Sequence, residues 1–158
     1  MEPLQLEPLA KGADRLLLPD DREAWQSFRV PKEPQYGLVS SLDGLVLLRR
    51  DLRGMLEAGD FERKVPVEKG KNEIGTLTDL SSHAILDRGR LVGVWEFDTA
   101  SESIVWLPFV AKNAALTKAV ERTQEYIRSQ LGDARSFSLD SPKSREPRLA
   151  ALRIVAHV

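Results

Sequence analysis

The chain has 158 residues, of which 42% are hydrophobic and 30% charged, and its net charge is −1. Its length and composition are typical of one globular domain with a core of its own. It contains no cysteine and two histidines, which excludes disulfides, thiolate metal sites, cysteine nucleophiles and multi-histidine metal sites, while a metal held by carboxylates stays open.

The sequence also limits the location and the partners that we expect for the protein. No apolar run approaches the ~18 residues of a membrane-spanning helix, and no signal-peptide pattern opens the sequence. We therefore expect a cytoplasmic protein with no membrane partner and no cofactor. Because the net charge lacks the basic excess of a free-standing nucleic-acid binder, a nucleic-acid role would need local clusters or another part of a larger protein.

The first half of the chain predicts short elements. Residues 1–13 contain Pro3 and Pro8 and are expected to be extended, and residues 14–18 form a candidate strand that ends before Pro19. Asp20 and Asp21 are expected to cap a helix over residues 22–28, and the two prolines of residues 30–34 indicate a loop. Beyond that loop we predict a strand over residues 36–40, a helix over 51–58, and a strand over 64–67 followed by a solvated loop.

Residues 83–131 are the most informative part of the sequence. They predict strands over 83–86, 91–97 and 104–109, joined by polar turns at 87–90 and 98–103. Alternation along the middle strand places Leu91, Trp95 and Phe97 on one face and Val92 and Val94 on the other, so that both faces should be covered. A helix capped by Asn113 and closed by Gly132 follows, with an apolar stripe suited to one face of the sheet. The stripe consists of Leu116, Ala119, Val120, Thr123, Ile127 and Leu131.

The last 26 residues predict a strand over 134–139 and then a helix with Pro147 in its first turn and a short apolar face of Leu149, Leu152 and Val155.

No pattern of residues indicates catalysis. Ser82, His83 and Asp87 include the residue types of a hydrolytic triad, but neighbours along a strand alternate faces, so His83 is expected to be a structural residue. Glu96 and Asp98 are a possible carboxylate pair without any sign of a cleft. We expect this chain not to be an enzyme.

The tryptophans allow two interpretations. Trp95 and Trp106 lie on consecutive predicted strands and, with Trp25, could stack nucleic-acid bases. Core packing is favoured, because Trp95 alternates with apolar residues.

Basic residues form the most useful clusters. One consists of Arg49, Arg50 and Arg53, a second flanks Gly89 and consists of Arg88 and Arg90, and a third marks a predicted serine-rich loop and consists of Lys143, Arg145 and Arg148. Each cluster alone is more often a solvated surface than a ligand site, but positions on a hairpin tip and in loops favour contact with phosphates.

Three segments together resemble a known family. They are LVSSLDGLVLLRRDLRGML (38–56), HAILDRGRLVGVWEFDTASESIVW (83–106) and LGDARSFSLDSPKSREPRLAALR (131–153). They are similar to segments in the C-terminal part of winged-helix DNA-binding-domain proteins related to the AlkZ and YcaQ DNA glycosylases, and the resemblance extends from about residue 15 onward.

The resemblance implies a fold and a role. The implied fold is α+β, with an antiparallel, partly barrel-like sheet, one long covering helix and short peripheral helices. Glycosylases of this family use a Q-x-Q or Q-x-D motif in a preceding winged-helix part, and none of the glutamines here has that spacing, so no catalytic residue is carried over. We therefore expect residues 1–158 to be a single domain, the isolated C-terminal domain of a larger winged-helix protein.

Two functions remain open. In one, the chain is a non-catalytic accessory domain that helps to bind DNA or braces the winged-helix region of the same polypeptide, and its partner is DNA through the parent protein. The DNA contacts would then come from Arg88, Arg90, Lys143, Arg145 and Arg148. In the other, the chain is a structural or protein-interaction module without nucleic-acid contact, a role that the net charge of −1 favours.

Overall fold

The computed structural model describes residues 5–11, 15–67 and 69–156. For residues 155 and 156 it describes the backbone only. The chain divides into two compact units, Met1–Lys32 and Glu33–Val158. The prediction of a single domain over the whole chain stays a prediction.

The described residues of the first unit form small elements. A two-stranded antiparallel ribbon pairs β1 with β2, and a 3₁₀ turn leads directly into the helix α1. Their bounds are β1 Glu7–Pro8, β2 Leu16–Leu17, the 3₁₀ turn Pro19–Asp21 and α1 Arg22–Ser27. The predicted strand and helix are confirmed in shorter form. Asp21 stands at the N-cap of α1, but its side chain makes no capping hydrogen bond.

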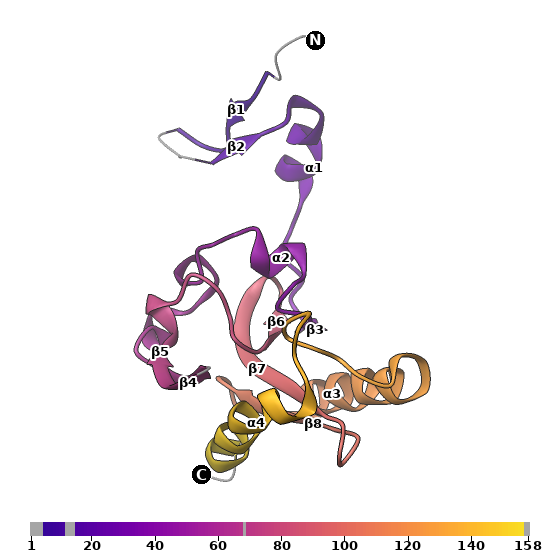
Figure 1. Cartoon of the computed structure of the whole chain (residues 1–158). Coiled ribbons are helices and arrows are strands. Elements are labelled where there is room, and N and C mark those ends of the chain that lie inside the picture. Colours follow the sequence, from indigo (N-terminus) through magenta and orange to yellow (C-terminus); the bar gives the residue numbers. More distant parts are fainter. Residues whose placement is uncertain (1–4, 12–14, 68, 157–158) are drawn as a thin grey trace. The chain divides into compact units, whose positions relative to one another are not determined.

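The second unit is an α+β fold built on antiparallel sheets (Figure 1). Its main sheet has the strand order β3-β6-β7-β8, and a separate hairpin pairs β4 with β5. Because β3 and β8 are both edge strands, the main sheet is open and, within the described residues, does not close into a barrel. The strands are β3 Tyr36–Val39, β4 Lys64–Val67, β5 Gly70–Glu73, β6 His83–Asp87, β7 Arg90–Asp98 and β8 Ser103–Pro108.

The described residues of this unit form three helices, two of which are long. The helices are α2 Gly44–Leu47, α3 Ala114–Tyr126 with a π-helical turn Ile127–Leu131, and α4 Pro142–Ala156. Three further 3₁₀ turns cover Arg53–Met55, Ala58–Asp60 and Ile74–Thr76. The sequence predicted α3 well: Asn113 accepts a hydrogen bond from the Leu116 amide at 2.9 Å, and Gly132 ends the helix in the left-handed region at φ 72°.

The two long helices contribute to apolar clusters on opposite faces of the main sheet. On the α3 face, Leu116 and Val120 of the helix pack with sheet residues such as Ile85, Trp95 and Phe97. On the α4 face, Leu152 packs with Leu86, Val94 and Leu107, together with residues of the segment 46–80. Both faces are therefore covered, as the apolar strands predicted.

A β-bulge changes which residues of β7 share a face. Ile85 pairs with Gly93 and Leu86 pairs with Leu91, so Val92 has no partner on β6. The extra residue shifts the alternation by one position. Leu91 consequently lies on the α4 face with Val94, and Val92 lies on the α3 face with Trp95, so the predicted grouping of these residues was wrong.

Other predicted elements also differ. Residues 51–58 contain the 3₁₀ turn Arg53–Met55 and the start of a second one, Ala58–Asp60, instead of a helix, and Gly54 within the segment disfavours a longer helix. Residues 134–139 are not a strand, because the Asp140 carboxylate accepts a hydrogen bond from the Phe137 amide (3.3 Å) while the Asp140 amide donates to the Phe137 carbonyl (3.1 Å).

The helix α4 begins five residues earlier than Pro147. It starts at Pro142, and the Ser141 hydroxyl accepts a hydrogen bond from the Ser144 amide (3.1 Å) as in a helix cap. Of the predicted apolar face, Leu149 and Leu152 are buried, whereas the side chain of Val155 lies outside the described part of the chain.

Two tryptophans, Trp95 and Trp106, lie on neighbouring strands of the main sheet. Trp95 pairs directly with Trp106 on β8, and its indole N–H donates to the Ala84 carbonyl at 3.1 Å. Trp95 is buried and Trp106 partly buried, in agreement with core packing, whereas Trp25 of the first unit is exposed.

Candidate functional site

The turn between β6 and β7 carries two of the predicted DNA-contacting residues. Arg88 and Gly89 occupy its tip with φ values of 51° and 83°. The Arg88 guanidinium donates to the Asp87 carboxylate (Nη2 to Oδ2, 2.9 Å), and this hydrogen bond raises the pKa of Arg88. Arg90 forms an ion pair with Glu57. Both arginines thus lie at the surface beside a carboxylate that offsets their charge.

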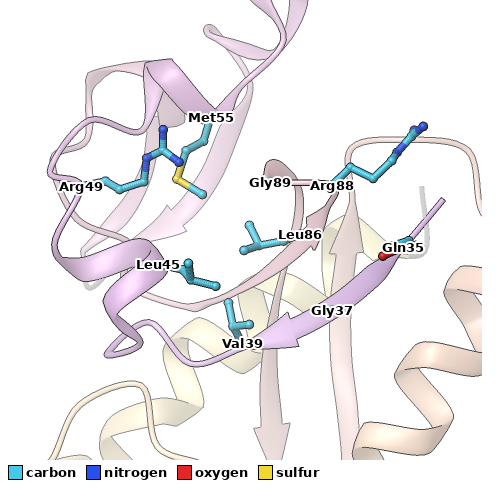
Figure 2. Close-up of a pocket in the computed structure, with 9 residues that line it drawn as sticks. All are labelled: Gln35, Gly37, Val39, Leu45, Arg49, Met55, Leu86, Arg88 and Gly89. Atoms are coloured by element: carbon cyan, nitrogen blue, oxygen red, sulfur yellow. The ribbon is translucent and has the colours of Figure 1, made fainter. Parts of the chain in front are cut away.

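A pocket next to this turn brings distant segments together (Figure 2). Its cavity is about 370 Å³ and is lined by Gln35, Gly37, Val39, Leu45, Arg49, Met55, Leu86, Arg88 and Gly89. Val39, Leu45 and Leu86 point toward one another, whereas the Arg88 side chain extends away from them. The pocket therefore has an apolar floor, with Arg49 and Arg88 at its border.

The third basic cluster has a different structure from the predicted loop. Lys143, Arg145 and Arg148 lie in the first two turns of α4, and of the three only Lys143 is exposed. Arg145 is 1% and Arg148 3% exposed. Both guanidinium groups are buried in this structure, which does not favour their contact with a phosphate, and DNA contact by these two residues stays a prediction.

The buried arginines join α4 to the sheet. Arg148 donates from Nε to Glu96 Oε1 (3.1 Å) and from Nη2 to Asp140 Oδ2 (2.5 Å). Arg145 makes two parallel hydrogen bonds to the Asp133 carboxylate, at 2.8 and 3.1 Å. Such charge-assisted, paired contacts are the geometry that a planar guanidinium favours.

Glu96 is the central carboxylate of this network. It lies on β7, is fully buried, and accepts a further hydrogen bond from the Ser136 hydroxyl at 2.8 Å. Burial raises the pKa of Glu96, although Arg148 and Ser136 act in the opposite direction. Burial also acts to raise the pKa of Asp133, but the hydrogen bonds from Arg145 and Arg135 outweigh it and lower that pKa.

Sequence reasoning missed the structural role of these arginines. Arg145 and Arg148 are three residues apart on a helix, a spacing that places two side chains on one face, and Glu96 interrupts an otherwise apolar strand. Together these features indicate a buried ion pair, but only once residues 142–156 are recognised as one helix. The sequence instead suggested a loop, because of its serines and prolines.

His83 is a buried neutral residue. Its Nδ1 accepts a hydrogen bond from the Ser41 amide (3.1 Å), so the neutral ring carries its proton on Nε2. The ring packs against Trp95 with centroids 4.2 Å apart. Burial, assisted by the nearby positive charges of Arg145 and Arg148, lowers the pKa of His83 to about 4. These contacts agree with a structural residue.

The other catalytic candidates are separated or already engaged. Asp87 lies at the opposite end of β6 from His83, where it accepts hydrogen bonds from the Gln35 amide and from Arg88. Asp98, two residues beyond the buried Glu96, is bound by Arg153 at 2.6 Å. The candidate triad and the candidate carboxylate pair are thus not assembled.

Within residues 5–11, 15–67 and 69–156, no three acidic or histidine side chains are grouped so that they could hold a metal ion. No helix in the same part of the chain is long and apolar enough to cross a membrane.

Comparisons with protein-family models, with curated proteins and with solved structures gave no match to this chain.

The buried His83 predicts a specific dependence of stability on pH. Its folded-state pKa of about 4 lies below the ordinary 6.5, so its contribution is complete above pH 6.5 and is lost as the pH falls toward 4. The loss amounts to about 3 kcal/mol at ~1.36 kcal/mol per pKa unit. The raised pKa of Glu96 acts in the opposite sense, so the effect must be measured as a difference between variants.

The measurement is urea unfolding of the wild type and of His83→Asn between pH 4 and 7. The asparagine retains an acceptor for the Ser41 amide but does not titrate. The stability advantage of the wild type should shrink by about 3 kcal/mol across this range. Two parallel pH profiles would show that His83 is not buried as a neutral ring.

Proposed function

We propose that the chain is a non-catalytic accessory domain of a larger winged-helix DNA-binding protein, and that it braces the rest of that protein through a protein–protein contact. The proposal rests on the resemblance of three sequence segments to that family and on one observation in the structure. Under this proposal, the open sheet covered by α3 corresponds to the family's partly barrel-like domain.

The observation is a run of exposed leucines at α2. Within residues 42–48, only Val46 enters the core, where it is 2% exposed. Leu42, Leu45, Leu47 and Leu48 are all exposed, Leu48 by 80%. Asp43 caps this short helix, because its Oδ1 accepts a hydrogen bond from the Leu45 amide at 2.8 Å. The helix is therefore well formed although it presents leucines to solvent.

Pockets on two sides of α2 extend this leucine segment. Leu45 borders the apolar pocket of Figure 2, and Leu42 and Leu47 border a second cavity of about 170 Å³ beside Leu80 and Phe137. Exposed apolar surface around hollows is typical of a protein-interaction site rather than of an ordinary solvated surface. Fully burying one leucine contributes about 1.5–3 kcal/mol, so the loss of two such anchors from an interface would be measurable.

The bracing role makes a prediction for the winged-helix region encoded beside this chain. That region, produced separately, should bind the chain in isothermal titration calorimetry. Leu45→Ser/Leu48→Ser should weaken the affinity at least tenfold, because each serine removes about 1.5 kcal/mol or more of apolar burial.

The matched control is Ile154→Ser, which alters an exposed apolar residue of α4 and should leave the affinity unchanged. If the winged-helix region is present and binds both serine variants as tightly as the wild type, the leucine segment is not the contact. If no such region binds, the bracing role is excluded.

A second candidate function is direct contact with DNA phosphates. The observation that favours it is the pocket of Figure 2, which brings Arg49 and Arg88 from separate basic clusters to one border. Arg49 forms no ion pair with any residue that the structure describes. The neighbouring Arg50 and Arg90 are paired with Asp79 and Glu57, which limits the positive charge of this surface.

DNA contact predicts a change in salt dependence. In the protein that contains both this chain and the winged-helix region, Arg49→Ala/Arg88→Ala should reduce the slope of log affinity against log salt by about 2, since each phosphate contact contributes about 0.9. Fluorescence anisotropy with a short duplex measures this slope. Lys71→Ala, an exposed lysine on the β4–β5 hairpin, is the control, and an unchanged slope for the double variant would exclude the two arginines as phosphate contacts.

A further inference from the structure

The strand β3 leaves one edge of the main sheet open. It pairs with β6 on one side, and on its other side no strand of the described chain continues the sheet. An open edge presents backbone N–H and C=O groups that another extended chain can bind. In β3 the edge is short, and its residues are partly buried rather than fully solvated.

The hydrogen bonds beside β3 identify the outward-facing groups. The amides of Gln35 and Ser41 both donate to side chains of β6, at 2.7 and 3.1 Å. Because the direction of N–H and C=O alternates along a strand, residues of the same parity face β6 and those between them face away. Tyr36 and Leu38 therefore direct their backbone groups to the open edge.

A groove runs between this edge and α3. Its first part is a hollow of about 540 Å³, where Gly37 and the end of the preceding loop face Ala115, Lys118, Ala119 and Arg122 of the helix. The glycine and the two alanines keep the hollow wide, and a Cβ added at Gly37 would meet nothing within 4 Å. Lys118 and Arg122 give this part a positive charge, because neither takes part in the ion pairs among the described residues.

The second part of the groove is mostly apolar. It is a hollow of about 310 Å³ whose walls include Leu38 and Trp95 from the sheet and Tyr126, Ile127 and Leu131 from the helical segment. The helix residues of the two hollows follow one another along one side of α3, so the groove continues from the basic part to the apolar part in the direction of the chain.

We propose that this groove binds an extended acidic peptide segment of another protein, which adds to β3 as an antiparallel fifth strand. Strand addition beside a helix uses the backbone for affinity and side-chain hollows for specificity. This surface is separate from the leucine segment at α2, and the inference does not depend on the proposed function.

The geometry specifies the order of residues in the peptide. Residues opposite Tyr36 and Leu38 have their side chains on the same face of the sheet as those two, which is the α3 face. In the antiparallel direction, the residue opposite Leu38 comes first and enters the apolar hollow. Two positions later, the residue opposite Tyr36 reaches Lys118 and Arg122, so the motif is an apolar residue, any residue, and then Asp or Glu.

The test uses the full chain and a fluorescent ten-residue peptide with a central Leu-Thr-Glu and threonine and valine flanks. Fluorescence anisotropy should show saturable binding. A lysine in place of the glutamate should weaken binding about tenfold, as should Lys118→Ala/Arg122→Ala in the protein. Lys64→Ala/Lys71→Ala, two exposed lysines on the β4–β5 hairpin, should have no effect.

N-methylation of the peptide tests strand addition separately from charge. A methyl group on the glutamate nitrogen removes an N–H that would face β3 and should abolish binding, whereas a methyl group on the threonine nitrogen faces away and should be tolerated. Equal effects of the two methyl groups would overturn strand addition. Absence of binding, or binding indifferent to the charge of the peptide, would overturn the proposal as a whole.

Discussion

A buried ion cluster is the interaction on which the larger unit depends. Arg148 of α4 contacts Glu96 on β7 and Asp140 in the segment that precedes the helix. All three are nearly inaccessible to solvent. Removing charges from water costs several kcal/mol per ion, and the paired, hydrogen-bonded geometry offsets this cost only while every member is present. Arg148 is therefore the contact between α4 and the sheet whose loss should cost most, beside the contacts of Arg145, Leu152 and Arg153.

The ion cluster also explains why the basic residues of this chain are poor guides to its function. Arg145, Arg148 and Arg153 neutralise carboxylates of the sheet and of the segment before α4. Several surface arginines also have an acidic neighbour, among them Arg50, Arg88, Arg90 and Arg135. The positive charge that remains without an ion pair in the described residues includes Arg49 beside the apolar pocket and Lys118 and Arg122 beside the open edge. The surfaces with binding potential are consequently apolar or only locally basic, which agrees with contacts to protein segments more than with broad contact to DNA.

The sequence predicted the parts of the fold in which local signals agree with tertiary packing. The hairpin of β6 and β7 and the capped α3 followed from alternation, turn residues and Asn113. The bulge at Val92 could not be predicted, because no residue type in β7 indicates where an extra residue interrupts the pairing. That extra residue places Leu91 on the opposite face of the sheet from the predicted one. The start of α4 was misplaced because the sequence offers two prolines, Pro142 and Pro147, and only packing decides between them.

The candidate sites were less predictable for a related reason. Whether an arginine is exposed depends on which residues pack over it in the fold. The sequence contains no catalytic pattern that would indicate a functional site independently of this packing. Arg88 and Arg90 were correctly placed at a hairpin tip, since a glycine turn fixes such positions. The carboxylate beside Arg88 is its sequence neighbour Asp87, whereas Glu57 beside Arg90 comes from a distant segment and could not be predicted. The groove between β3 and α3 could not be predicted from the sequence, because it depends on the position of β3 at the edge of the main sheet.

The most direct test of this account is a double-mutant cycle between Glu96 and Arg148, measured by urea unfolding at pH 7. Arg148→Met should cost about 3 kcal/mol or more, because it leaves the buried carboxylates of Glu96 and Asp140 without their cation. Glu96→Gln should cost about 2 kcal/mol, because it removes one of the two carboxylates that bind the buried guanidinium while Asp140 remains. The double variant should lose at least about 2 kcal/mol less than the sum of the two. Lys143→Met on the same helix should change the stability by less than about 0.5 kcal/mol. Losses that simply add, or single losses below about 1 kcal/mol, would contradict the central role of the ion cluster.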